Sequence, residues 1–191
     1  MAQGAYEPRR MNADTFFTLP DDGHRYELID GEVEMAPAPS ADVHQFTVGK
    51  LFLALAPFVD NHDLGLVLPA PTDVILSAFD VVQPDLLFVR AEREVIVGGR
   101  IHGAPDLVVE VLLPTTAAFD LGLKLRRCAR FGVPWYWSVD PESRTLRELE
   151  LIEGSYVERS RSEGNALFRP ILFPGLTIDL GLVWPRRRRA G

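Results

Sequence analysis

Two apolar runs that each contain a carboxylate most constrain how this chain can fold. The run LLFV follows Gln83-Pro84-Asp85, and the run DLVVEVLL has Glu110 inside it. A run that is apolar on both faces is typical of a strand buried in the middle of a sheet. A buried carboxylate is costly unless something compensates it, so we expect both acids to lie at a functional site. The alternative is that Glu110 points to solvent or pairs with an arginine.

A helix is predicted directly after the second run, from Phe119 to Phe131, and Gly132 predicts its end. Because this helix follows the strand of Glu110, one of its faces should return across that strand. Lys124 would then approach the carboxylate, where it could stabilise developing charge or orient an attacking water. Asp120 would hold Lys124 or bind a water beside the site. The alternative is a solvated ion pair between Asp120 and Lys124, which are four residues apart.

Asp85 and Glu110 together would make an oxygen-ligand pair suited to Mg²⁺ or Mn²⁺. Such a metal can polarise a phosphoryl oxygen and generate hydroxide from water. We therefore predict metal ligands at Asp85 and Glu110, and a catalytic set of Asp85, Glu110 and Lys124. Asp106 also follows a proline, but it lies about 13 Å from Glu110 along an extended strand. We assign Asp106 to the entry of that strand.

The remaining elements predict a fold of the α/β class, with helices and strands mixed along the chain (α+β). A hairpin is expected from Tyr26 to Met35 around Asp30-Gly31, and a second in TLRELELIEGSYVERSRS. A long helix is expected after Ser40. The order of elements favours a central mixed sheet flanked by helices, with the two hairpins as additions. We predict one domain over residues 12–184, with flexible tails at 1–11 and 185–191.

Composition narrows the function classes. The net charge of -7 argues against a large basic surface for duplex DNA, although a short basic groove remains compatible with it. A single cysteine excludes an internal disulfide and a cysteine-rich zinc site. The chain shows no signal peptide and no apolar run long enough to cross a bilayer. We expect a cytoplasmic protein without a membrane partner.

Several motifs resemble those of one family. EVLLPTT-x3-D-x3-K is preceded by YELIDGE and QPDLLFV and followed by GVPWYWSVDP. In this order they resemble the Uma family, whose members have the PD-(D/E)XK restriction-endonuclease-like fold. The resemblance implies a central mixed sheet, divalent-metal binding and nuclease chemistry on DNA. It makes Pro84-Asp85 the PD element and Glu110 the acid of the (D/E)XK element.

The chain departs from the general nuclease motif at Leu112, where that motif has lysine. In the family pattern the lysine comes from the following helix, and Lys124 is the match. Some nucleases of this fold add an N-terminal acid to the metal site, and we favour Glu32 over Glu27 for that place. An exposed hairpin acid is the alternative. His44 could approach the site as a base or phosphate contact, or it could be structural.

Three functions remain open at this point. The first is a metal-dependent endonuclease that hydrolyses DNA phosphodiester bonds. The second is a non-catalytic nucleic-acid-binding or oligomeric module that keeps the nuclease fold, which the acidic balance favours. The third is hydrolysis of a smaller phosphate ester. The aromatic segment WYW and the edge hairpins offer a surface for a homodimer.

Overall fold

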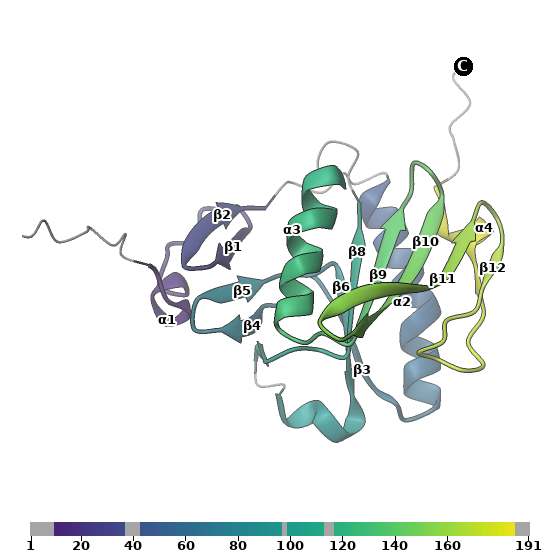
Figure 1. Cartoon of the computed structure of the whole chain (residues 1–191), viewed down its shortest axis with the longest axis horizontal. Helices are drawn as coiled ribbons and strands as arrows, with labels where there is room; N and C mark the ends of the chain where they lie inside the picture. The colour runs from purple at the N-terminus through teal and green to yellow at the C-terminus, as the bar shows by residue number, and fades with distance from the viewer. Residues whose placement is uncertain (1–9, 37–42, 97–98, 113–116, 186–191) are drawn as a thin grey trace, which may run out of the picture.

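The computed structural model describes residues 10–36, 43–96, 99–112 and 117–185. Figure 1 shows a larger sheet at the centre of the molecule, with a second sheet beside it on the N-terminal side. The larger sheet has six strands in the order β11-β10-β9-β8-β6-β3. Its strands are β3 (Gly65–Pro69), β6 (Leu86–Arg90), β8 (Leu107–Val111), β9 (Trp135–Asp140), β10 (Thr145–Ile152) and β11 (Ser155–Glu163). Strands β8 and β9 are parallel and the other neighbours antiparallel, so the sheet is mixed.

The second sheet has five strands in the order β2-β1-β5-β4-β7. Its strands are β1 (Tyr26–Ile29), β2 (Glu32–Met35), β4 (Val74–Ser77), β5 (Asp80–Val82) and β7 (Ile101–His102). A two-stranded sheet pairs β12 (Leu167–Phe168) with β13 (Ile178–Asp179). The mixed fold with flanking helices is confirmed. The N-terminal hairpin, which was expected as an addition to the central sheet, pairs with β5 and so belongs to the second sheet.

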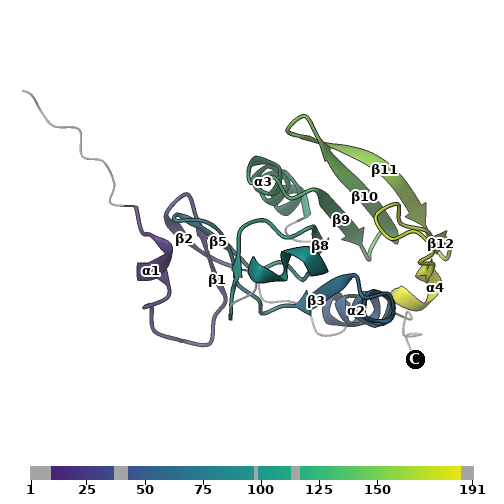
Figure 2. The ribbon, with the colours of Figure 1, turned by 90° about the horizontal axis from the view of Figure 1, so that it is seen from below.

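The two long helices cover opposite faces of the six-stranded sheet (Figure 2). These are α2 (His44–Asn61) and α3 (Ala117–Arg130). Leu107, Val109 and Val111 pack into the core that includes α2, whereas Val108 packs with Cys128 of α3. Side chains alternate between the faces of a strand, so Glu110 belongs to the face covered by α3. All residues of β8 are buried, as expected of its central position.

Helix α3 connects the parallel strands β8 and β9 and therefore runs back across the sheet. Its end follows from the sequence: Gly132 adopts a φ of +77°, a conformation that residues with a side chain rarely adopt. The amide of Val133 donates to the carbonyl of Cys128 and closes the last turn. The observed helix agrees with the predicted one to within two residues at each end.

The short elements complete the chain. They are α1 (Ala13–Phe16), the 3₁₀ helix η1 (Ala91–Ile96) and α4 (Leu180–Val183). The Asn12 side chain caps α1 by accepting from the amide of Thr15. Asp179 ends β13, and its side chain accepts from the amide of Gly181 and starts a helical turn. The predicted limits of the domain stay a prediction, and most of both predicted tails lies outside the described residues.

No helix within the described ranges is both long and apolar enough to cross a membrane. The large apolar residues instead form the interior between α2 and the six-stranded sheet, where Trp137 and Phe173 meet edge to face.

Glu148 of β10 is a structural carboxylate with no solvent exposure. Its oxygens accept from the indole of Trp137 and from the amides of Ile171 and Leu172. Replacing Glu148 with alanine leaves these donors without a partner, so we expect the free energy of unfolding to fall by about 3 kcal/mol or more. Glu150→Ala is the matched control because it removes only an exposed ion pair with Arg159. Denaturant unfolding measures both, and equal losses would contradict the assignment.

Candidate active site

Asp85 lies at the start of β6, where it is buried. Strands β6 and β8 pair with Leu86 opposite Val109. Extending this antiparallel register by one residue places Asp85 opposite Glu110, and opposite residues in such a pair have Cβ atoms about 4.5–5.5 Å apart. One oxygen of Asp85 accepts the amide of Val111 at 2.8 Å. The local fold therefore brings together the two acids that the sequence singled out.

Lys124 of α3 reaches the carboxylate of Glu110. Its Nζ lies 3.3 and 3.2 Å from the two Glu110 oxygens. The Glu110 side chain is 10% exposed and that of Lys124 is 22% exposed, so the pair is largely shielded from water. The chain has leucine at position 112, and the lysine that contacts Glu110 comes from α3.

A third carboxylate approaches from β1. The Oε1 atom of Glu27 lies 3.8 Å from Nζ of Lys124 and accepts the amide of Gln83 at 3.0 Å. Glu27 is buried, whereas Glu32 is exposed on the edge strand β2. The structure therefore corrects the preference for Glu32: the N-terminal acid beside Lys124 is Glu27. The position of β1 between β2 and β5 explains the burial of Glu27, since an acid on an inner strand has less access to water.

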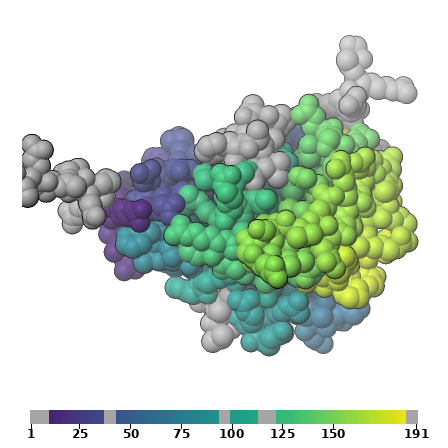
Figure 3. All heavy atoms as spheres, viewed as in Figure 1, coloured from purple at the N-terminus to yellow at the C-terminus, as the bar shows by residue number. Residues whose placement is uncertain are grey.

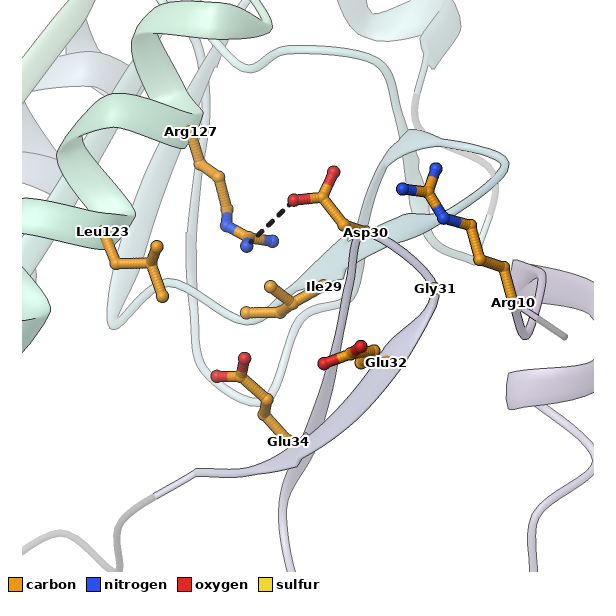
Figure 4. Close-up of a pocket in the computed structure, with 8 residues that line it drawn as sticks. All are labelled: Arg10, Ile29, Asp30, Gly31, Glu32, Glu34, Leu123 and Arg127. Carbon is orange, nitrogen blue, oxygen red and sulfur yellow. Dashed lines mark ion pairs between the residues drawn. The ribbon is translucent and has the colours of Figure 1, made fainter. Parts of the chain in front are cut away.

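Glu32 lines a different pocket, of about 350 Å³, between the N-terminal hairpin and α3. Figure 4 shows Glu32 and Glu34 on β2, with Arg127 of α3 paired to Asp30 across the pocket. Its charged lining consists of three carboxylates and the guanidinium groups of Arg10 and Arg127. This excess of acids does not suit a phosphate ligand.

His44 is the first residue of α2 and is buried. Its Nε2 lies 3.1 Å from the Asp85 oxygen that also accepts the amide of Val111. His44 therefore contacts the site through Asp85, and from α2 it positions that carboxylate. The side chain of Asp120 lies outside the described part of the structure.

Asp106 lies elsewhere, as its distance along the strand indicated. Its carboxylate accepts from the amide of Arg90 and from Arg93 at 2.8 Å. It holds η1 against the entry of β8 and takes no part in the candidate site.

Arg127 is a structural residue that the sequence did not reveal. Its guanidinium is buried and pairs with Asp80 of β5 at 3.1 Å and with Asp30 at 3.5 Å. These contacts fasten α3 to the five-stranded sheet, one helical turn beyond Lys124. Both acids lie far from Arg127 in sequence, so only the packing of α3 on that sheet reveals the contact.

The pKa of Glu110 is raised from its ordinary value of 4.5 to about 8. Burial is the largest cause, and the charges of Asp85 and Glu27 raise it further, while Lys124 opposes them. The site thus gathers more negative charge than one lysine offsets. A small cavity of about 10 Å³ lies against Glu27, Glu110 and Lys124, about the space of one water molecule.

A divalent cation would relieve this repulsion, and the donors are the hard oxygens that Mg²⁺ and Mn²⁺ prefer. Within the described ranges, no three His, Cys, Asp or Glu side chains are arranged to hold a metal ion. Asp85 and Glu110 still fit Mg²⁺, which is commonly held by one or two carboxylates together with waters and substrate phosphates.

The chain is similar to known proteins in sequence and in fold. The chain matches the profile of the Uma2 family, described as "Putative restriction endonuclease", over residues 13–181. It also resembles the crystal structure of a "putative nuclease belonging to DUF820" from Anabaena variabilis. The TM-score is 0.75 at 17% identity, covering 91% of this chain and 97% of that one, which shows a shared fold. No curated protein matches the chain. The family match spans most of the sequence, so the chain belongs to the Uma2 family.

Proposed function

We propose that this protein is a metal-dependent endonuclease that hydrolyses DNA phosphodiester bonds. The observation that carries the proposal is the contact of Lys124 with both oxygens of Glu110, beside the buried carboxylate of Asp85. Two acids and one lysine converge from β6, β8 and α3, although they are spread over forty residues of sequence. Family membership and the nuclease-like fold support this reading.

Asp85 and Glu110 would hold one Mg²⁺ or Mn²⁺ ion. Bound there, the metal would act as a Lewis acid toward a phosphoryl oxygen and lower the pKa of a coordinated water. Val111 and His44 fix the orientation of Asp85 by contacts to one of its oxygens. The second oxygen of that carboxylate can then face a cation.

Lys124 is the cation that the chain itself supplies. Its ammonium group can orient the attacking water or stabilise negative charge that develops on the phosphoryl oxygens. Oε1 of Glu27 lies 3.8 Å from Nζ of Lys124, close enough to help position that ammonium group. Because the site is shielded, these electrostatic interactions are stronger than they would be in bulk water.

Nicking of supercoiled plasmid tests the proposal. We expect nicked product with Mg²⁺ or Mn²⁺ and none with EDTA, because the carboxylates need the metal to engage phosphate. A generic phosphodiester assayed in parallel should turn over much more slowly than DNA. Cleavage that persists in EDTA would contradict the proposed metal dependence. Faster turnover of the small ester would favour a hydrolase of smaller phosphate esters.

The second candidate is a nucleic-acid-binding module that keeps the fold without catalysis. It is favoured by one observation, that leucine stands at position 112, where the general nuclease motif has lysine. DNA binding without cleavage in either metal would establish this second function and reject the first.

A further inference from the structure

A row of four residues crosses the larger sheet from the candidate site to its outer edge. Glu110 pairs in register with Ser138 of β9, Ser138 with Arg147 of β10, and Arg147 with Arg161 of β11. Residues opposite one another on neighbouring strands share a face of the sheet. With strands about 4.8 Å apart, the backbone of Arg161 lies about 14 Å from that of Glu110.

The outer part of this row opens into a hollow of about 270 Å³. Its polar lining consists of Ser138, Asp140, Ser143, Thr145, Arg147 and Arg161. Leu112 also lines it and follows β8 directly, two residues after Glu110. The hollow therefore lies at the end of the sheet where β8 and β9 finish. Figure 3 shows β11 beside α3 on one face of the molecule.

The charged groups that line the hollow itself are two guanidinium groups and one carboxylate. Asp140 is the acid in its lining, and its oxygens already accept from the amides of Glu142 and Ser143 and from the Ser143 hydroxyl. The guanidinium groups of Arg147 and Arg161 remain as its cationic lining.

The ion pairs of these arginines are exchangeable. Arg147 lies 3.5 Å from Glu158, and Arg161 lies 2.6 Å from Glu163. Arg161 contacts the same Glu163 oxygen through two of its nitrogens, Nε and Nη2. All four side chains are a third or more exposed, so water competes with each pair. A phosphate, which accepts two parallel bonds from a guanidinium, can displace such a partner.

We propose that this hollow binds a backbone phosphate of the DNA substrate and so sets the strand against the Asp85–Glu110–Lys124 site. The inference rests on the proposed function and adds to it the place where the substrate is held. Contacts to phosphate position nucleic acid without reading its sequence, which agrees with a site built of two arginines and hydroxyl groups.

Equilibrium binding to a fluorescent 20-base-pair duplex tests this, measured by anisotropy in Ca²⁺ between 50 and 200 mM salt. We expect Arg147→Ala and Arg161→Ala each to weaken binding on the order of tenfold. The double variant should also lower the magnitude of the slope of log K against log salt by about 1, as expected for the loss of one phosphate contact. Arg159→Ala is the matched control: it removes the same charge from β11, but its partner is Glu150, outside the hollow.

Unchanged melting temperatures would show that the variants fold. Binding by the Arg147→Ala, Arg161→Ala double variant at the wild-type level would overturn the proposal. An equal loss in Arg159→Ala would overturn it too, since the effect would then be general charge. Absence of DNA binding by the wild type would reject the hollow as a DNA site. Arginine-dependent binding without cleavage in Mg²⁺ or Mn²⁺ would reject the nuclease function and leave the phosphate site standing.

Discussion

Lys124→Met is expected to lower metal-dependent DNA cleavage by about a hundredfold to a thousandfold, the usual cost of removing one stabilising group from a site of this kind. Methionine keeps an unbranched apolar side chain in α3 and removes only the ammonium group. Nζ of Lys124 is the cation that contacts both oxygens of Glu110, so its loss removes the charge that balances the acids. The loss should fall on kcat, measured by plasmid nicking in Mn²⁺ over a range of DNA concentrations.

The chain offers a matched control, because it contains one other lysine. Lys50 lies on α2, where its Nζ stands over the ring of Phe46. Lys50→Met should cleave DNA at close to the wild-type rate. If Lys124→Met also retained full activity, the lysine of the helix would not be the counterpart of the lysine missing at Leu112.

Glu110→Gln is expected to make the metal-free protein more stable than the wild type at pH 8. The pKa of Glu110 is raised from 4.5 to about 8 by burial and by the neighbouring charges of Asp85 and Glu27. In the unfolded chain the group ionises near its ordinary value. Between pH 4.5 and about pH 8, the folded wild type therefore binds one more proton than the unfolded chain.

Protonation of the buried Glu110 stabilises the folded protein at acidic pH. This contribution to stability is fully present below about pH 4.5 and is lost as the pH rises toward about 8. The loss amounts to at most about 1.4 kcal/mol for each pH unit within that window. Glutamine does not titrate, so the variant lacks this loss, and its difference from the wild type should shrink toward pH 5.

Thermal unfolding in EDTA from pH 5 to pH 9 measures this difference, with Glu32→Gln as the control for an exposed acid. Added Mn²⁺ should stabilise the wild type at pH 8 and have much less effect on Glu110→Gln, because the variant lacks one proposed ligand. Parallel stability curves for the wild type and Glu110→Gln in EDTA would contradict the raised pKa.

Local patterns predicted most of the secondary structure. The N-terminal hairpin has the predicted limits because Asp30 and Gly31 both adopt positive φ angles, which a tight turn of this kind requires. The strand around Glu110 was predictable because a run that is apolar on both faces has only one suitable place in a sheet. The turn of helix at residues 180–183 was missed, since its cap involves only a few residues.

The candidate site was predictable where its residues lie on neighbouring elements. Asp85, Glu110 and Lys124 come from two strands and the helix that follows them, so strand pairing and the crossover suffice to bring them together. Glu27 was not predictable in the same way. Glu27 and Glu32 flank the same turn, and only the pairing of β1 with β5 decides which of them is buried.

The sequence by itself determined the family, most of the elements and the burial of Asp85 and Glu110, because these depend on short-range periodicity and on residues adjacent in the chain. Only the tertiary structure decided that Glu27, and not Glu32, lies beside Lys124. The tertiary structure also decided that Arg127 joins α3 to the second sheet, and that Arg147 and Arg161 continue the row of Glu110. The physical reason is that burial and charge balance depend on neighbours in space, and strand register across several strands is set by the packing of the whole sheet.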